Sequence, residues 1–502
     1  MAYKVFFTVM LFVSFACMPL NRTRADDMAE AIAKAEKAVL DGVAQAEKDP
    51  NRPVFHFRPP ARWMRDICGA IFYKGYYHIF HQLNPYFDTW GSTGAGFCWG
   101  HARSKDLVTW EVLPIALAPM TERGERRCNS GCVALNGNGT PMIFYTFVPS
   151  RGNATKLGKR EQWAAIPRDD ELKTWQRVKE NPLMAAGMNG VPDSVNAGWS
   201  DPFVFRAGGR AFVTFKECDG LVAEAENKEL TKWKYRGRIS GVTGECPNFF
   251  KLQDKWVLLR STYPPSYQVG MFDHDQMKFH FDHDKSGTLD YVYGSKKPDP
   301  WAQGFYGTNV LFDNKGRCIL FGFVSGFKPD MGWKGCMSLP RVLKLGPHGH
   351  PIQIPAPELA RLRGKHAGTG ELTLKNESKT VAGVGGDTLE VSAKFTAGDA
   401  GKFGLRLRPR DGKKGSIELV CDGRALDAAG TRVPEVVAPE QKTLDLHVFF
   451  DKSVLELFIN DGQKTVTKVV YPGSRDLQVE VFSEGGSVTV KSVEAWEIGS
   501  IW

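Results

Sequence analysis

The sequence predicts an all-β protein in which a five-bladed β-propeller is followed by a C-terminal β-sandwich and preceded by a short helix. Short apolar runs separated by Gly, Asp and Asn fill residues 51–345, and such runs are typical of strands joined by tight turns. A weak repeat recurs through the same region, and longer alternating strands dominate residues 368–502. At 502 residues, a single core is not expected.

The start of the chain predicts export. Residues 1–25 combine Lys4 with an apolar stretch too short to span a bilayer, which predicts an export signal cleaved after Ala25. The protein is therefore expected in the periplasm or outside the cell. Lipid anchoring through Cys17 is the alternative, although Ser14 is smaller than the aliphatic residue usual at that position.

A helix is predicted over residues 26–50, which are rich in Ala, Glu and Lys. Met28, Ile32 and Val39 recur at helical spacing, and Pro50 ends the pattern. We expect this helix to pack on the main domain. A helix that binds a partner protein is the alternative.

A short repeat marks the predicted blades. Its three copies end in Trp110, Trp175 and Trp233, and each copy has a leucine three residues before the tryptophan. The interval is about sixty residues, and two or three strand-like runs precede each copy. This arrangement fits four-stranded blades around a central channel. At this spacing, residues 51–345 hold about five blades.

The second half of the chain has a different pattern. Residues 346–367 are rich in Pro, Gly and His, which predicts a linker. Alternating strands such as 389–395 and 444–450 then follow at short intervals, and they predict a β-sandwich. Asn460-Asp461-Gly462 predicts a hairpin turn. No catalytic cluster is visible in this half.

Composition restricts the classes of function. The net charge is +9, but no dense Lys/Arg run exists, so nucleic-acid binding is not expected. No stretch after the predicted signal is long and apolar enough for a membrane-spanning helix. The ten cysteines include no paired CxxC motifs and are too few for a disulfide scaffold.

Three carboxylates stand at the head of apolar runs, at intervals that match the blades. They are Asp66, Asp201 and Glu245. Corresponding positions of successive blades face one channel, so the three should converge, although a single Asp-Pro pair is more often a turn. Converging carboxylates raise the pKa of at least one of them. An ionised nucleophile beside a protonated acid is the pair that retaining glycosidases use, about 5–5.5 Å apart.

The motifs around these acids resemble those of glycoside hydrolase family 32, the invertase, inulinase and levanase group. The resemblance covers roughly residues 55–498. The family's Trp-Met-Asn-Asp-Pro-Asn-Gly and Trp-Gly-His-Ala-x-Ser-x-Asp-Leu-x-x-Trp motifs are matched at 63–69 and 99–110. Its Arg-Asp-Pro and Glu-Cys-Pro motifs are matched at 200–202 and 245–247, and two further segments are matched at 81–85 and 338–341.

The resemblance implies a retaining hydrolase that cleaves a fructofuranoside or related furanoside through a covalent glycosyl-enzyme. It implies Asp66 as nucleophile, Glu245 as acid/base, and Asp201 as the residue that holds sugar hydroxyls and stabilises the transition state. The substrate is a small molecule, an oligosaccharide or a polysaccharide, and no cofactor or metal is expected. The substrate-binding positions implied by place, for several of which a scaffold role is the alternative, are Arg65, Gln82, Trp90, Ser130, Ser200 and Tyr306.

Because of three departures from the family motifs, the sequence does not determine which sugar is bound. Arg65 stands where the family has Asn, Ile67-Cys68 where it has Pro-Asn, and Ser200 where it has Arg. Arg65 could supply the missing cation from the other side of the pocket. Because the groups that grip the sugar differ, the alternatives are a different furanosyl substrate or a catalytically silent carbohydrate-binding protein.

Four cysteines surround the predicted site. Cys68 and Cys246 flank the acids, and Cys128 and Cys132 precede a strand that should face the same channel. Ordinary buried thiols, a disulfide and a metal site are the three alternatives.

Overall fold

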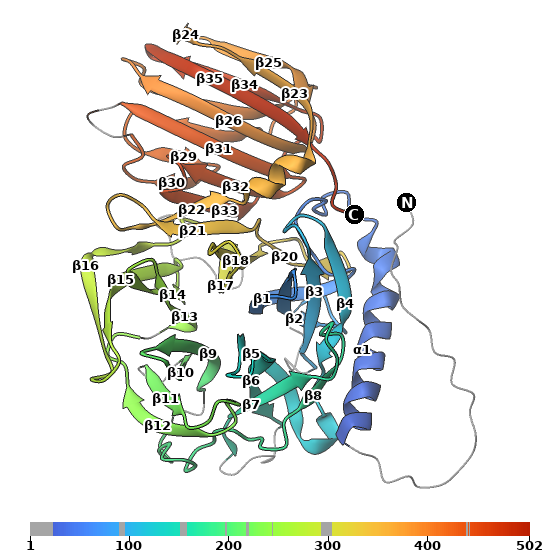
Figure 1. Ribbon diagram of the computed structural model, residues 1–502. Coiled ribbons are helices and arrows are strands. Elements are labelled where there is room, and N and C mark those ends of the chain that lie inside the picture. Colours follow the sequence, from blue (N-terminus) through green and yellow to red (C-terminus); the bar gives the residue numbers. More distant parts are fainter. Residues whose placement is uncertain are drawn as a thin grey trace.

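The computed structural model describes residues 24–89, 96–150, 158–195, 198–216, 220–242, 244–292, 304–437, 440 and 442–502. Residues 1–23 of the predicted export signal, with Cys17, and the predicted site residue Trp90 lie outside the described residues. In the described part of the chain, five sheets form a ring and two further sheets stack beside it (Figure 1). This arrangement confirms the predicted propeller and sandwich.

Each blade is an antiparallel sheet whose strands follow one another along the chain. Blade I also carries the short β19 (Trp333–Lys334), which runs parallel to β1, and blade V carries β20 (Cys336–Met337) beside β18. The strands of blades I to V are β1 (Arg62–Tyr73), β2 (Tyr76–Asn84), β3 (Cys98–Ser104), β4 (Trp110–Leu117); β5 (Glu125–Leu135), β6 (Pro141–Pro149), β7 (Glu161–Pro167), β8 (Trp175–Arg177); β9 (Ser200–Ala207), β10 (Arg210–Lys216), β11 (Leu221–Ala225), β12 (Trp233–Arg238); β13 (Glu245–Leu252), β14 (Lys255–Ser261), β15 (Ser266–Asp273), β16 (Lys278–Thr288); β17 (Gly304–Phe312), β18 (Cys318–Ser325), β21 (Arg341–Leu345) and β22 (Pro351–Pro355).

The first strand of each blade lines the inside of the ring. β1 contacts β5, β5 contacts β9, β9 contacts β13, β13 contacts β17, and β17 returns to β1. The parallel pairing of β19 with β1 also ties the end of the propeller to its first blade. Residues from five distant parts of the sequence therefore meet around one axis (Figure 1).

The repeat seen in the sequence is one turn used three times. The indole N–H groups of Trp110, Trp175 and Trp233 donate to the carbonyl of the leucine three residues earlier, over 3.2, 2.9 and 2.8 Å. Those leucines have left-handed φ values of 63°, 58° and 57°, a conformation that costs free energy in a non-glycine residue. The buried indole holds the turn in place, and each tryptophan opens the outermost strand of its blade.

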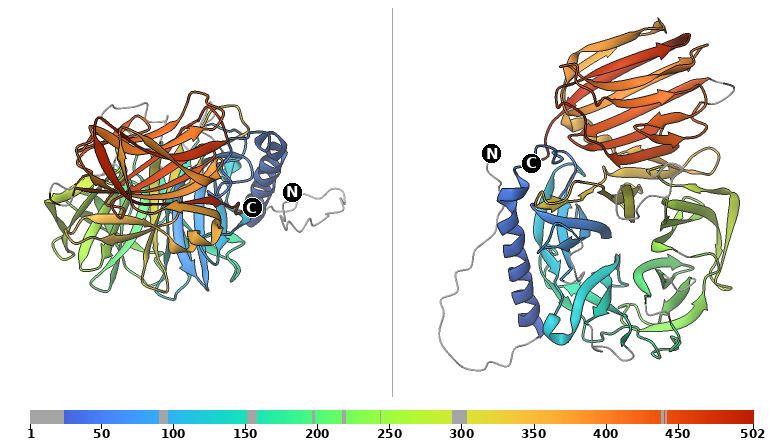
Figure 2. Two further views of the ribbon diagram at one scale, coloured as in Figure 1. Left: turned by 90° about the horizontal axis from the view of Figure 1, so that it is seen from above. Right: turned by 180° about the vertical axis from the view of Figure 1, so that it is seen from behind.

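Helix α1 (Arg24–Ala46) lies along the outer side of blade I (Figure 2). Met28, Ala35 and Val39 are buried on its inner face, as the helical spacing predicts, and Glu36 Oε1 accepts a 3.1 Å hydrogen bond from the Ile115 amide. The helix packs on the main domain. No helix within the described ranges is long and apolar enough to cross a membrane.

The region expected to be a linker contains regular structure. β22 pairs with β21 and completes blade V, and η3 (Pro357–Leu362) leads directly into the sandwich. The sandwich strands, first in one sheet and then in the other, are β23 (Arg363–Thr369), β24 (Leu372–Lys375), β26 (Thr388–Ala397), β31 (Thr443–Asp451), β32 (Val454–Ile459), β33 (Lys464–Val469), β35 (Ser487–Ile498); β25 (Ser378–Gly385), β27 (Lys402–Pro409), β28 (Ile417–Cys421), β29 (Leu426–Ala428), β30 (Thr431–Val433) and β34 (Leu477–Glu484).

The predicted Asn460-Asp461-Gly462 turn joins β32 to β33, and all three residues have positive φ. A Cβ atom at Gly462 would lie 1.8 Å from the Gln353 carbonyl oxygen on β22. The turn therefore needs glycine both for its conformation and for close contact with the propeller.

Buried charges join the propeller to the sandwich. His56 Nδ1 lies 2.8 Å from Asp451 Oδ2, and His56 Nε2 lies 3.2 Å from Glu456 Oε1. Arg341, from blade V, donates to Glu456 Oε2 over 2.7 Å and forms an ion pair with Asp290. All these side chains are almost completely inaccessible to solvent, so the interface depends on their mutual pairing.

Candidate active site

Irregular register at the inner strands positions the candidate site. A β-bulge adds a residue to one strand and turns side chains away from the regular alternation. In the described strands, a register shift accompanies the inner strand of every blade, at Met64/Ile67, Asn129/Gly131, Thr214/Lys216 (on β10, opposite the start of β9), Glu245/Asn248 and Tyr306/Asn309.

Asp66 lies within the first of these shifts and is buried. The Ser130 hydroxyl donates a 2.7 Å hydrogen bond to Asp66 Oδ2, and the Cys246 thiol lies 3.8 Å from the same oxygen. The other oxygen, Oδ1, lies 3.5 Å from Arg65 Nε and has no hydrogen-bond partner among the described residues. Asp66 is thus hydrogen-bonded through one oxygen, while the other is buried beside Arg65 without a hydrogen bond to a described residue.

Close packing behind Asp66 requires a glycine. Gly307 has a φ of 52°, and a Cβ atom built there would lie 2.6 Å from Asp66 Oδ1. A side chain at position 307 would therefore displace the carboxylate.

Asp201 is buried beside Asp66 and has a left-handed φ of 55°. The Cys246 amide donates to Asp201 Oδ2 over 3.3 Å, and the Cys246 thiol lies 3.8 Å from that oxygen as well as from Asp66. Burial raises the pKa of Asp201; Lys216 opposes this effect, whereas Glu245 and Asp66 add to it. The raised pKa is the one that convergence of the acids predicts.

Glu245 has donors on both oxygens. Lys216 Nζ forms an ion pair with Oε1, and the Tyr306 hydroxyl lies 2.9 Å from Oε2. Burial acts to raise the pKa of Glu245, but Lys216, Tyr306 and Arg65 together lower it below its ordinary value. The acid with the raised pKa is therefore Asp201 rather than Glu245, although the family resemblance gives proton donation to Glu245.

The remaining predicted residues differ in their distance from the acids. Arg65 faces Asp66 and lies with its guanidinium carbon 5.9 Å from the centroid of the Phe323 ring. Gln82 donates to Asn129 Oδ1 over 3.4 Å, and Asn129 is the residue before Ser130 in the chain.

The Ser200 hydroxyl makes no hydrogen bond to any described residue, and therefore none to the three acids. It is buried and pairs across the ladder with Lys216. The cation next to Asp201 and Glu245 therefore comes from the neighbouring strand, and not from position 200 or from Arg65 alone.

Sequence reasoning missed Lys216, Gly307 and Tyr263. Tyr263 stacks on Tyr306 with ring centroids 4.8 Å apart. The sequence pattern could have indicated Lys216: β9 and β10 form a hairpin, so the end of β10 lies beside the start of β9, next to Asp201. Gly307 and Tyr263 had no comparable signal.

The cysteines around the site are separate buried thiols. Cys68 lies 3.8 Å from the Ser130 hydroxyl, Cys128 faces Glu125, and Cys132 accepts a hydrogen bond from the Val204 amide. The eight cysteines within the described ranges are all buried and free. Those ranges also contain no group of three or more His, Cys, Asp and Glu residues that could hold a metal ion.

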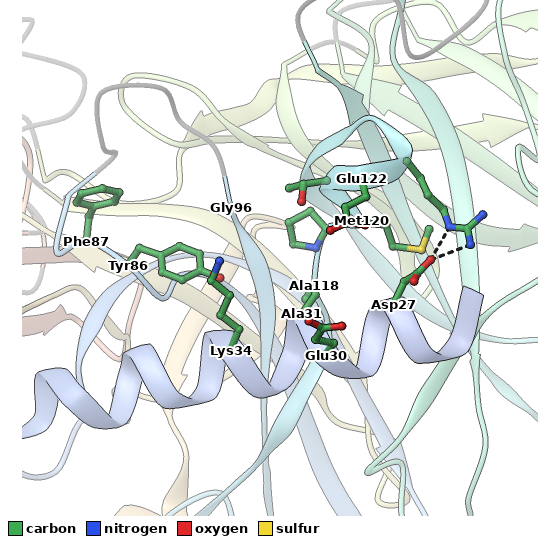
Figure 3. Close-up of a pocket in the computed structure, with 13 residues that line it drawn as sticks. Asp27, Glu30, Ala31, Lys34, Tyr86, Phe87, Gly96, Ala118, Met120 and Glu122 are labelled. Carbon is green, nitrogen blue, oxygen red and sulfur yellow. Dashed lines mark hydrogen bonds and ion pairs between the residues drawn. The ribbon is translucent and has the colours of Figure 1, made fainter. Parts of the chain in front are cut away.

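A hollow of about 360 Å³ lies away from the acids, between α1 and blade I (Figure 3). Tyr86 and Phe87 lie at one end of it and Asp27 at the other. Asp27 forms an ion pair of 2.7 Å with Arg123, which also lines the hollow. None of the three predicted catalytic acids lines this hollow.

A propeller whose inner strands bring three carboxylates together, followed by a β-sandwich, has the architecture of a β-propeller glycoside hydrolase. The chain belongs to the glycosyl hydrolases family 32: the profile of the "Glycosyl hydrolases family 32 N-terminal domain" matches residues 56–355, and that of the "Glycosyl hydrolases family 32 C terminal" matches residues 358–497. It is an enzyme of the β-fructofuranosidase type.

Relatives of known name agree with this membership. The chain is 28% identical over 508 residues to a levanase of Bacillus subtilis, covering 90% of this chain and 71% of the levanase. It is 26% identical to a sucrose-6-phosphate hydrolase of Escherichia coli, covering 89% of this chain and 95% of that protein.

Solved structures share the fold. Fructan 1-exohydrolase IIa from Cichorium intybus superimposes with a TM-score of 0.77 at 23% identity, covering 90% of this chain and 98% of that one. A β-fructofuranosidase of Bombyx mori gives a TM-score of 0.74 at 24% identity, covering 94% and 99%.

Proposed function

We propose that this protein is a retaining β-fructofuranosidase in which Asp66 is the nucleophile, Glu245 the acid/base and Asp201 the transition-state stabiliser. The observation that carries the proposal is the state of Asp66: Ser130 holds Oδ2, while Oδ1 has no hydrogen-bond partner among the described residues. A buried carboxylate fixed through one oxygen keeps a lone pair on the other oxygen for attack.

The reaction proceeds in two balanced steps. Asp66 Oδ1 bonds to the anomeric carbon as the glycosidic C–O bond breaks, and the departing oxygen takes a proton from Glu245. Water then attacks the anomeric carbon and gives a proton to Glu245, the ester bond breaks, and Asp66 leaves as a carboxylate. Asp201, with its raised pKa, lies next to Asp66 and can hydrogen-bond sugar hydroxyls in both protonation states.

The substrate proposed first is a plain fructoside, such as sucrose, inulin or levan. Support comes from the family and from relatives named levanase and sucrose-6-phosphate hydrolase. No nucleic acid takes part in this reaction.

A second candidate is a furanoside with a different or modified sugar. Arg65 is buried beside Asp66, and Arg127 on β5 is a second buried arginine. Its burial, and then neighbouring arginines, lower the pKa of Arg127 to about 9. Guanidinium groups bind acceptor-rich or anionic substituents. A panel of sucrose, inulin, levan, arabinofuranosides and anionic sugars separates the two: efficient cleavage of unmodified fructans excludes the second candidate.

The catalytic assignment is tested by Asp66→Ala and Glu245→Ala. Both should abolish sugar release while the unfolding temperature and circular dichroism stay close to those of the wild type. Asp254→Ala, at an exposed turn of the same propeller, is the control. Full activity of either site variant would show that the assignment is wrong.

A catalytically silent carbohydrate-binding protein is the remaining alternative. Calorimetry would then show sugar binding by the wild-type protein with no turnover of any substrate in the panel. Turnover that is lost in Glu245→Gln excludes this alternative.

Export is also part of the proposal. Support comes from Lys4 and the short apolar stretch before Ala25. N-terminal sequencing of the protein from the periplasm or medium should show cleavage after Ala25. Retention in a membrane fraction that is released by Cys17→Ser would instead show a lipid anchor.

A further inference from the structure

We propose that Lys216 is a positioning residue that keeps Glu245 ionised before substrate binds and thereby sets the alkaline limit of activity. The proposal rests on the role of Glu245 as acid/base. Lys216 lies at the end of β10, outside the motifs that contain the three acids.

The hairpin of β9 and β10 aims Lys216 at Glu245. Lys216 pairs across the ladder with Ser200, the residue before Asp201, and the register shifts between Thr214 and Lys216. The shift sends the side chain toward the next blade, where Nζ forms an ion pair with Glu245 Oε1. The side chains of Lys216 and Glu245 are 15% and 36% exposed, so water screens this pair in part, but less than it screens a fully exposed surface pair.

Tyr306 can serve either protonation state of Glu245. Its hydroxyl carries one proton but lies 2.9 Å from Glu245 Oε2 and 2.6 Å from the Ser261 carbonyl oxygen. Beside an ionised Glu245, the hydroxyl can donate to the carboxylate. Beside a protonated Glu245, the hydroxyl can donate to the Ser261 carbonyl and accept a hydrogen bond from the carboxyl O–H of Glu245. Tyr306 is therefore not the group that forces ionisation.

The other groups around Glu245 act in both directions. Burial and the nearby acids favour the protonated form, and cations favour the ionised form. Lys216 acts more strongly than any other group that lowers the pKa of Glu245. Among the described residues, the charged and titratable groups around Glu245 include Lys216 from β10, Arg65 from β1, Asp201 from β9, Tyr306 from β17, its own neighbour Cys246, and Tyr263 from the turn after β14. Asp66 lies next to Cys246, whose thiol is 3.8 Å from it.

The two steps of the reaction need opposite states of Glu245. Glycosylation needs the protonated acid, whereas deglycosylation needs the carboxylate as base. Lys216 therefore favours the second step and restricts the first step to acidic pH. Removal of the ammonium group should extend glycosylation to higher pH and slow the second step.

The kinetic test compares the pH dependence of kcat/KM in Lys216→Met, Lys216→Arg and the wild type. The alkaline limb should move up by about one pH unit in Lys216→Met, because a cation within a few ångströms shifts a carboxyl pKa by that amount. The value of kcat should fall, because Glu245 is then a carboxylate less often in the second step. Lys216→Arg should keep the wild-type limb. Lys251→Met removes an exposed lysine from β13, the strand of Glu245, and is the matched control.

A second measurement does not depend on activity. Carbon-13 NMR of labelled glutamate carboxyls, with Glu245 assigned through Glu245→Gln, follows the titration of Glu245 in the free protein. The titration midpoint should rise by about one unit in Lys216→Met and in Lys216→Gln, either of which suffices if the other does not fold.

The two measurements separate the possible failures. An unchanged Glu245 titration and an unchanged alkaline limb in the folded variants would overturn the role of Lys216. A raised titration midpoint in a protein that cleaves no glycoside would retain the electrostatic role of Lys216 and reject the proposed function instead.

Discussion

The hydroxyl of Ser130, on the inner strand of blade II, lies 2.7 Å from Asp66 Oδ2 on the inner strand of blade I and donates a hydrogen bond to it. Both residues lie at register shifts of their strands. The contact therefore exists only because two neighbouring blades have irregular strands at the same level of the ring. It links the shape of the propeller to the carboxylate proposed as nucleophile.

Loss of this contact should reduce catalysis. In Ser130→Ala, the buried carboxylate loses a charge-assisted hydrogen bond worth about 1.5–3 kcal/mol. We expect kcat/KM for the best substrate to fall roughly tenfold to a hundredfold, and the unfolding midpoint to fall as well, because the folded state loses the same bond. Ser130→Thr, which keeps the hydroxyl, should recover most of the activity. Equal activity of Ser130→Ala and the wild type would contradict this interpretation.

Crowding behind Asp66 should have a larger effect. In Gly307→Ala, the new methyl group would lie 2.6 Å from Asp66 Oδ1, so the nucleophile must move and kcat/KM should fall roughly a hundredfold. Gly316→Ala is a matched control, because Gly316 has a positive φ of 74° but open space where the methyl group would lie. If folded Gly307→Ala were as active as Gly316→Ala, the methyl group at position 307 would not displace Asp66 and this interpretation would be wrong.

The interface between the domains should lose stability as the pH rises. Burial acts to lower the pKa of His56, but Asp451 and Glu456 raise it from 6.5 to about 9. The folded state therefore holds a proton that the unfolded chain releases near pH 6.5. The stabilisation, on the order of 3 kcal/mol, is complete below pH 6.5 and is lost as the pH approaches 9.

Unfolding of His56→Gln provides the measurement. The denaturant midpoint of the wild type should fall between pH 6.5 and 9, and the midpoint of His56→Gln should be lower at acidic pH and nearly constant over that window. The exposed His280, on β16, is the site for the control His280→Gln. A wild-type midpoint that does not change over this window would show that His56 is neutral in the folded protein.

Arg341→Met tests the same interface from the other partner. Arg341 is fully buried, donates to Glu456 over 2.7 Å and pairs with Asp290. Its loss leaves Asp290 without that cation and Glu456 with His56 as its remaining cation, and should cost about 3–5 kcal/mol of unfolding free energy. Limited proteolysis should then cut more readily near the domain boundary. Arg361→Met, at a side chain that is 65% exposed, should change stability by less than about 1 kcal/mol.

Local patterns were sufficient for much of this protein. The Trp110, Trp175 and Trp233 repeat predicted the blades because each copy builds its own turn through a bond between residues three apart. The Asn460-Asp461-Gly462 turn and the inner face of α1 were predictable for the same reason. The structure of residues 346–367 was harder to predict, because their Pro and Gly residues are typical of a linker. The segment contains β22, which pairs with β21, and η3.

The spacing of Asp66, Asp201 and Glu245 along the chain predicted three acids at blade heads, since each blade is a local unit of the chain, although the blades begin at unequal intervals. Their chemical state followed from contacts between blades. Asp201 has the raised pKa because of its burial, and Glu245 a lowered one because of Lys216, whose side chain crosses from blade III to blade IV. The electrostatic energy of a carboxyl depends on distances to charges that are remote in sequence, so only the closed ring determines that the pKa of Asp201 rises and that of Glu245 falls.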